Sequence, residues 1–280
     1  MKNYMRIWAL LTLALSFEFW ALNGHREFSF LVKLQDLQIL DSSRQFSTAP
    51  GRTISLWLGW VGFGLMVLMN VYSMRKRIEF LTGKGKLSSW LNFHIFCGLL
   101  GPTLIFFHCG LKVRGMVGIS FWSMVISLSS GIVGRYFFNQ LSTKKNDFEL
   151  KAQAAIEKLE AVFKRKSFEF DEAQKEKVLN LSLQHAGGFP GAIDINPFSA
   201  FVSSLSGDFR YVFREMPMPK NWPRSARVAL SNYAMSKRKA QFIVPFETLM
   251  GYWHTFHFPF AVFMYVAAVI HIVSSLIFLT

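Results

Sequence analysis

The apolar run from Trp90 to Gly110, WLNFHIFCGLLGPTLIFFHCG, limits what this chain can fold into more than any other feature. An α-helix of about 20 apolar residues crosses the hydrocarbon core of a bilayer. Ionisable side chains are costly there and usually face a bundle interior or a bound group. His94 and His108 are fourteen residues apart, so they lie on nearly the same helix face, roughly 21 Å apart along the axis. The run therefore predicts a transmembrane helix with two functional histidines.

Other apolar runs predict an all-α, polytopic membrane helical bundle of about five transmembrane helices. The chain is 51% apolar and 16% aromatic, as expected for a membrane protein and not for a soluble one. We interpret the first run as an uncleaved span and not as a signal peptide, because bulky residues occupy the positions where cleavage needs small ones. The four other predicted spans are Met1–Trp20, Thr53–Met74, Val117–Phe138 and Met250–Thr280.

The segment 140–245 differs in character and predicts a helical cytoplasmic insertion between the fourth and fifth spans. It contains 28 of the 48 formally charged residues. Apolar residues recur at helical spacing between Phe148 and Phe163 and predict an amphipathic helix. Further helices are expected near 171–184, 198–215 and 223–240. The predicted organisation is therefore spans one to four in 1–139, the insertion in 140–245, and the fifth span in 246–280.

The positive charge of the chain indicates its orientation in the membrane. The net charge of +14 lies mainly in loops, where it fits membrane topology and anionic lipid better than nucleic acid. The basic loop 75–89, the insertion 140–245 and the N-terminal Lys2 and Arg6 all belong on the cytoplasmic side. Five crossings then place the N-terminus inside and the C-terminus outside, in a membrane that we expect to be the bacterial inner membrane. The third and fifth spans run in the same direction.

A second pair of histidines repeats the spacing of the first. His257 and His271 are also fourteen residues apart, in the fifth span. With parallel spans, His94 and His257 share the inner level, whereas His108 and His271 share the outer level. Neutral imidazole is an axial ligand for haem iron, so the pattern predicts two b haems, each held by two histidines. His254 competes with His257 as the inner ligand, and the shared spacing favours His257.

Small and basic residues near these histidines complete the predicted haem sites. Gly98 and Gly101 lie between His94 and His108 and leave room for a flat macrocycle. Close helix packing is an equal alternative for the glycines of the second and fourth spans, namely Gly59, Gly62, Gly64, Gly131 and Gly134. Haem propionates need cations at the membrane edges. Lys112 and Arg114 are available at the outer edge, and Arg135 at the inner edge, where it could equally extend to the lipid headgroups.

A non-redox subunit is the alternative that the same histidines allow, either a transporter or a complex-assembly scaffold in which they bind protons or a metal ion. A proton or metal site would call for acidic residues within the spans, and Glu18 is the only carboxylate embedded in the spans as drawn. The absence of a CxxCH motif excludes covalently attached c-type haem. Cys97 and Cys109, both in the third span, have no assigned role.

The two histidine pairs on parallel spans resemble the dihaem membrane cytochromes of b type. Both the quinol-oxidising cytochromes b and the transmembrane core of ferric reductases and NADPH oxidases have this plan. The ferric reductase core also places its ligands on the third and fifth spans, with the N-terminus inside. The phrases FHCGLKVRG at 107–115 and SGIVGRYFF at 130–138 further resemble a set of poorly characterised bacterial dihaem membrane proteins.

The chain departs from these families in ways that limit the functional prediction. No sixth span follows the fifth, no GxGxxG motif follows a strand, and no PEWY-like sequence is present. We therefore expect an electron-transfer cytochrome or an oxidoreductase subunit, with no catalytic residue assigned. Its partners would be membrane lipid, a cytoplasmic redox protein or partner subunits, and, at the outer face, a quinone or another redox protein. The direction of electron flow stays open.

Overall fold

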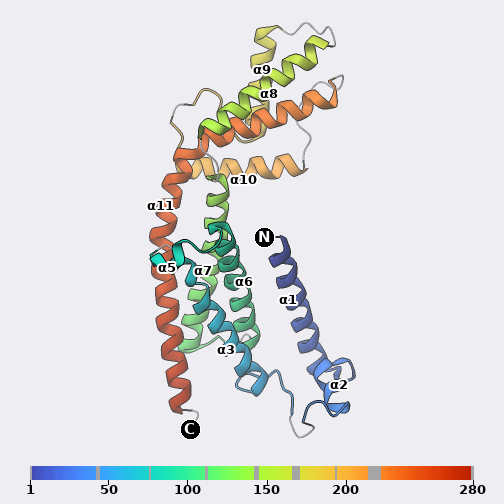
Figure 1. Ribbon diagram of the computed structural model, residues 1–280, viewed down its shortest axis with the longest axis vertical. Coiled ribbons are helices and arrows are strands. Elements are labelled where there is room, and N and C mark those ends of the chain that lie inside the picture. Colours follow the sequence, from blue (N-terminus) through green and yellow to red (C-terminus); the bar gives the residue numbers. More distant parts are fainter. Residues whose placement is uncertain are drawn as a thin grey trace. The chain divides into compact units, whose positions relative to one another are not determined.

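The computed structural model of the chain describes residues 2–41, 45–75, 77–110, 113–141, 145–165, 171–192, 194–213 and 222–278. All regular secondary structure in these ranges is helical, which confirms the predicted fold class (Figure 1). Five of the helical segments described are long and apolar enough to cross a membrane. The chain is therefore an integral membrane protein whose apolar helices contact lipid.

The candidate spans agree closely with the apolar runs of the sequence. The second span is interrupted at residues 69–70 and consists of two helices. The spans comprise α1 (Lys2–Leu22), α3 (Thr53–Leu68) with α4 (Val71–Arg75), α6 (Leu87–Cys109), α7 (Gly115–Gln140) and α11 (Arg224–Phe278).

The remaining helices are short or belong to the insertion. The three helices that we expected first in the insertion are present, each within three residues of its predicted bounds. The short helices are η1 (Arg26–Phe28), α2 (Phe30–Asp36) and α5 (Glu79–Thr82), and those of the insertion are α8 (Lys145–Arg165), α9 (Glu172–His185) and α10 (Pro197–Phe213).

The last helix corrects one expectation. We expected a helix near 223–240 and a separate span from Met250, but α11 is one continuous helix of 55 residues that includes Pro245 and Pro259. Proline removes a helical hydrogen bond and favours a break. Here Phe242, Ile243 and Phe246 are buried on both sides of Pro245, and this packing holds the helix together across the proline.

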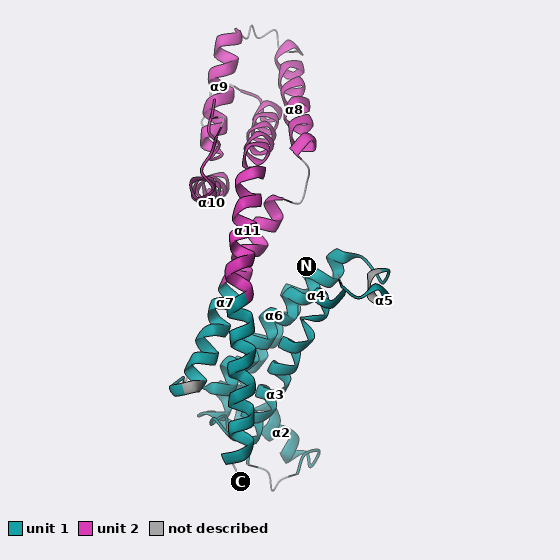
Figure 2. Cartoon of the chain, turned by 90° about the vertical axis from the view of Figure 1, so that its left-hand side faces the viewer, with its two compact units in different colours: residues 1–129, 259–280 teal, residues 130–258 magenta. Residues whose placement is uncertain are grey.

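The chain divides into two compact units (Figure 2). The first contains residues 1–129 and 259–280, and the second contains residues 130–258. The boundaries fall inside α7 and α11. The whole of the insertion 140–245 lies in the second unit, together with the adjoining turns of these two helices.

In the first unit, α3 and α6 pack through a pair of glycines. A Cβ atom at Gly62 would lie 3.0 Å from the Gly101 carbonyl oxygen, and one at Gly101 would lie 3.0 Å from the Gly62 carbonyl oxygen. Only residues without a side chain allow two helix backbones to approach this closely. On α1, the Trp8 indole donates to the Thr103 hydroxyl of α6 at 3.1 Å. The contact between Gly62 and Gly101 thus determines where α3 and α6 cross.

Glu18, the carboxylate embedded in the first span, has a structural role. It accepts hydrogen bonds from the Ser29 hydroxyl at 2.5 Å and from the backbone N–H groups of Phe30 and Leu31 at 2.9 and 3.1 Å. These N–H groups lie in the first turn of α2, where helical donors lack intrahelical partners. The carboxylate therefore caps α2.

In the second unit, an ion pair between a buried arginine and a half-buried aspartate joins the helices. Arg238 of α11 is 1% exposed and donates to the Asp208 carboxylate of α10 at 2.6 Å and to the Ala186 carbonyl at 2.7 Å. Tyr136, on the last turns of α7, donates to the same carboxylate at 2.8 Å. Since a buried charge is tolerated only when it is paired and hydrogen-bonded, this network fixes α10 to both long helices.

Candidate functional site

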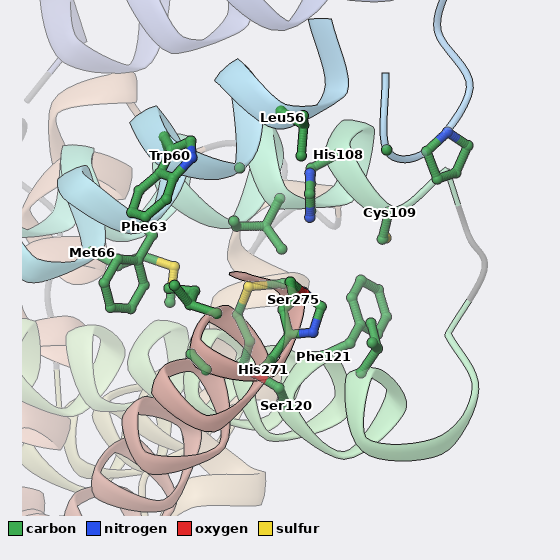
Figure 3. A pocket seen from close by; sticks show the side chains of 18 of the residues that line it. Leu56, Trp60, Phe63, Met66, His108, Cys109, Ser120, Phe121, His271 and Ser275 are labelled. Atoms are coloured by element: carbon green, nitrogen blue, oxygen red, sulfur yellow. The ribbon is translucent and has the colours of Figure 1, made fainter. Parts of the chain in front are cut away.

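A cavity of about 320 Å³ in the first unit contains two of the four histidines of interest. His108 of α6 and His271 of α11 both line it (Figure 3). In Figure 3 the two imidazoles enter the same space from different helices. The volume is within the range of about 300–1,000 Å³ that is usual for small-molecule sites. The structure therefore brings together the two residues that we predicted for the outer haem.

The ring of His108 is held by Ser55 of α3. Its Nδ1 atom lies 2.7 Å from the Ser55 carbonyl oxygen, and the Ser55 hydroxyl donates to the His108 carbonyl oxygen at 2.7 Å. Ser55 is fully buried. Because a carbonyl oxygen can only accept, this contact requires the proton to be on Nδ1. The lone pair of the ring is then on Nε2, the nitrogen that would ligate a metal.

Gly59, one turn after Ser55, leaves room for the same ring. A Cβ atom at Gly59 would lie 2.8 Å from Nδ1 and 2.9 Å from Cε1 of His108. Any side chain at this position would displace the imidazole. The face of α3 that carries Ser55 and Gly59 is therefore shaped around His108.

The rest of the cavity wall is mostly apolar. Its large side chains include Trp60, Phe63 and Phe121, while Ser120 and Ser275 contribute hydroxyl groups. Among the residues that the structure describes, no group of three or more His, Cys, Asp or Glu side chains is arranged to hold a metal ion. The polar groups at this cavity are therefore the two imidazoles, the Cys109 thiol and two hydroxyl groups, in otherwise apolar surroundings.

His94, the other histidine of α6, is held in a similar way. Its Nδ1 atom lies 2.9 Å from the Met69 carbonyl oxygen, at the end of α3. The ring of Tyr72 lies 5.4 Å from that of His94, centroid to centroid. As with His108, a carbonyl partner at Nδ1 places the lone pair of the ring on Nε2.

His257 belongs to the second unit, where α7 and Trp253 surround it. Its Nδ1 atom lies 2.6 Å from the Ser130 hydroxyl of α7, and the Trp253 ring stacks on its imidazole at 4.8 Å. The Trp253 indole in turn donates to the Ser130 carbonyl oxygen at 2.7 Å. Gly134 makes room for this tryptophan, since a Cβ atom there would overlap the indole.

His254 has different surroundings. It is exposed and stacks on Phe258 of the same helix. Of the two candidates for the inner ligand, His257 is the one directed toward α7. His94 and His257 belong to different units, and their pairing at one iron stays a prediction.

None of the remaining residues predicted for the site that the structure describes is part of the cavity lining. A Cβ atom at Gly98 would lie 3.5 Å from the Met69 sulfur, and Gly101 packs against α3. The macrocycle contact predicted for these two glycines stays a prediction. Arg114 is exposed in the loop before α7. The Arg135 guanidinium lies 5.6 Å from the centre of the Phe138 ring. Lys112 lies outside the described residues.

Reasoning from the sequence missed the residues that hold the histidines. Ser55, Ser130 and Trp253 are not distinguished by composition or by helical spacing. The glycines of α3 and α7 were visible as small residues, but nothing showed that Gly59 faces His108.

Comparisons with protein-family models, with curated proteins and with solved structures found no match.

Proposed function

We propose that this chain is a membrane cytochrome that transfers electrons through two b haems, each held by two histidines. The observation that carries the proposal is the cavity between α3, α6, α7 and α11 that His108 and His271 both line. Two helices far apart in sequence contribute one imidazole each, which is the arrangement needed to hold an iron from both faces of a macrocycle.

The donor set favours haem over a bare metal ion. Protein sites for zinc usually supply three or four ligands. This cavity is lined by two imidazoles, by the Cys109 thiol, which donates to the Phe106 carbonyl oxygen at 3.4 Å, and by no carboxylate, and these groups are not arranged as a metal cluster. A haem brings four nitrogen ligands of its own and takes two from the protein. The apolar wall also suits a large aromatic macrocycle.

The chain's own residues would determine how the site behaves. Haem supplies a one-electron change of its iron when it is bound. Ser55 keeps the proton of His108 on Nδ1, so that Nε2 faces the cavity, and such hydrogen bonds orient a ligand and raise its basicity. If His108 and His271 both ligate the iron, they would leave no open position for oxygen or substrate, so the site would favour electron transfer over ligand chemistry.

The inner haem and the topology complete the proposal. His94 and His257 would hold the inner haem, with the N-terminus in the cytoplasm and the C-terminus outside, in a bacterial inner membrane. This orientation follows from the basic loop 75–89 and the charged insertion. The inner site would exchange electrons with a cytoplasmic partner or partner subunit. The outer site would exchange them with a quinone or a second redox protein.

Haem counting tests the proposal. The purified protein should show reduced-minus-oxidised α and Soret bands and about two b haems per chain by pyridine haemochrome assay. His108→Ala and His271→Ala should each lower the count to about one. His254→Ala is the matched control, because His254 is a histidine of the same helix as His271 but is exposed and stacks on Phe258.

Two results would contradict the proposal. A folded, monodisperse preparation that stays colourless after expression with added haem precursor would exclude a b-type cytochrome. If His271→Ala kept both haems while His254→Ala lost one, the assignment of His271 as a haem ligand would be wrong.

A further inference from the structure

The helix α10 carries an apolar face that no described element covers. Its residues at positions i, i+4, i+7, i+11 and i+14 from Phe198 are all large, apolar and exposed, and Phe213 extends the face. Phe198 and Phe209 are 69% and 61% exposed. This stripe, which we call the α10 face, consists of Phe198, Val202, Leu205, Phe209, Val212 and Phe213.

The opposite side of α10 faces the other helices of the second unit. Its buried residues are small, namely Ala200, Ser204 and Gly207. The Ser204 carbonyl oxygen accepts from Arg238 of α11 at 3.3 Å, and a Cβ atom at Gly207 would overlap the Ala186 carbonyl group at the end of α9. The α10 face therefore points away from α9 and α11, and Figure 1 shows α8 and α9 on one side of α10.

The level of α10 relative to a bilayer follows from its anchor on α7. A hydrocarbon core of about 30 Å needs about 20 helical residues, and 20 residues counted from Val117, where the candidate span begins, end at Tyr136. Tyr136 bonds to Ser204 and Asp208 of α10 at 2.8 Å. The ring of Phe137 lies 5.3 Å from that of Phe201. The anchor of α10 is therefore at the end of the hydrocarbon core.

The direction of α10 also fits a membrane surface. In Figure 1, α10 runs across the direction of the neighbouring turns of α7. A helix that crosses a transmembrane helix at the level of the headgroups lies parallel to the bilayer plane. Amphipathic helices in that position bury an apolar face at the boundary between headgroups and acyl chains.

The charges of α10 are kept off this face. Its two charged residues are Asp208 and Arg210. Asp208 is paired with buried Arg238, and Arg210 contacts Ser206. We propose that the α10 face is a membrane-surface site, in which α10 lies in the cytoplasmic leaflet and holds the second unit against the lipid. This inference does not depend on haem binding.

Lipid-borne quenchers test this inference in the intact chain. Val202→Cys is labelled with an environment-sensitive fluorophore, and the protein is reconstituted in phosphatidylcholine nanodiscs that contain lipids with a nitroxide near the top of the acyl chain. The emission should shift to the blue, and quenching should exceed several-fold that of the same label at Gln153→Cys. Gln153 is an exposed position of α8 in the same unit. The parent chain measures background labelling of Cys97 and Cys109, which are both buried.

Phe209→Cys, labelled in the same way, tests the same face independently in case Val202→Cys does not fold. Equal quenching at positions 202, 209 and 153 would overturn the inference, because the α10 face would then have no special contact with lipid. Efficient disulfide cross-linking of two copies through Cys at position 202 would also overturn it, because a second chain would then cover the face.

Discussion

Replacing Gly59 by alanine should selectively empty the outer of the two haem sites that we propose. Alanine normally stabilises a helix interior by about 1 kcal/mol relative to glycine, so the variant should fold at least as well as the parent. The unfavourable contact that the new methyl group makes is with the imidazole of His108. A Cβ atom at position 59 would lie 2.8 Å from the Nδ1 atom of that ring.

The size of the effect follows from the distances. Ordinary contact begins at about 3.4 Å, so the ring must retreat by roughly 0.6 Å from α3. Ser55 lies one turn earlier on the same helix, and the ring would move away from its carbonyl as well. The hydrogen bond of 2.7 Å would then lengthen to about 3.3 Å, beyond the usual range. Loss of such a contact to a metal ligand typically costs about 10–100-fold in affinity.

Haem content and electron paramagnetic resonance would measure this effect. We expect Gly59→Ala to retain about one haem per chain, or to retain two with a changed low-spin signal for one of them. Gly64→Ala is the matched control on the same helix, because a Cβ atom there would meet nothing within 4 Å. If Gly59→Ala kept two haems with an unchanged spectrum, the assigned orientation of His108 would be wrong.

Three other substitutions test single side-chain contacts and should change the stability of the protein by different amounts. Ser55→Ala removes the hydroxyl but keeps the carbonyl that accepts from His108, so haem content should stay the same while the free energy of unfolding falls by about 1 kcal/mol, as measured by denaturant titration. Asp208→Asn leaves Arg238 buried without its anion and should cost about 3 kcal/mol, seen as earlier loss of helical circular dichroism in urea. Lys175→Met breaks an exposed pair with Glu160 and should cost about 0.5 kcal/mol or less. The hydrogen bond to Glu160 raises the pKa of Lys175 above its ordinary 10.5, so this small contribution is present at neutral pH and lost as the pH rises through the raised pKa.

The spans and most helices could be predicted because their signals are local. Twenty apolar residues in a row, or apolar residues at helical spacing from Phe148 to Phe163, need no knowledge of the partner element. The continuity of α11 could not be predicted this way. A proline at position 245 favours a break locally, and only the packing of Phe242 and Phe246 against other segments outweighs it.

The contacts that shape the candidate site are non-local, and the sequence alone does not reveal them. Ser55 and His108 are 53 residues apart, and Ser130 and His257 are 127 apart. Serine occurs throughout the chain, so neither residue stands out. The histidines could be selected because an imidazole is rare and costly in a span, whereas the groups that orient them are ordinary helix residues whose role arises from the fold.

The crossing of α3 and α6 orients His94 and His108 through the same kind of contact. The carbonyls of Ser55 and Met69 contact Nδ1 of His108 and His94 respectively. These carbonyls are fourteen residues apart, one in the first turn of α3 and the other at its C-terminal cap, and the two histidines are also fourteen residues apart on α6. Gly62 lies midway between the two carbonyls and Gly101 lies midway between the two histidines, and these glycines meet at the crossing. The two helices are therefore antiparallel in a single register, and the close glycine contact brings each carbonyl within reach of the one ring that faces it. In the proposed cytochrome, the tautomers of the inner and outer ligands of α6 would follow from the same packing contact. Since a backbone carbonyl survives any side-chain substitution, the crossing itself, and not residues 55 and 69, would have to be altered to release both histidines.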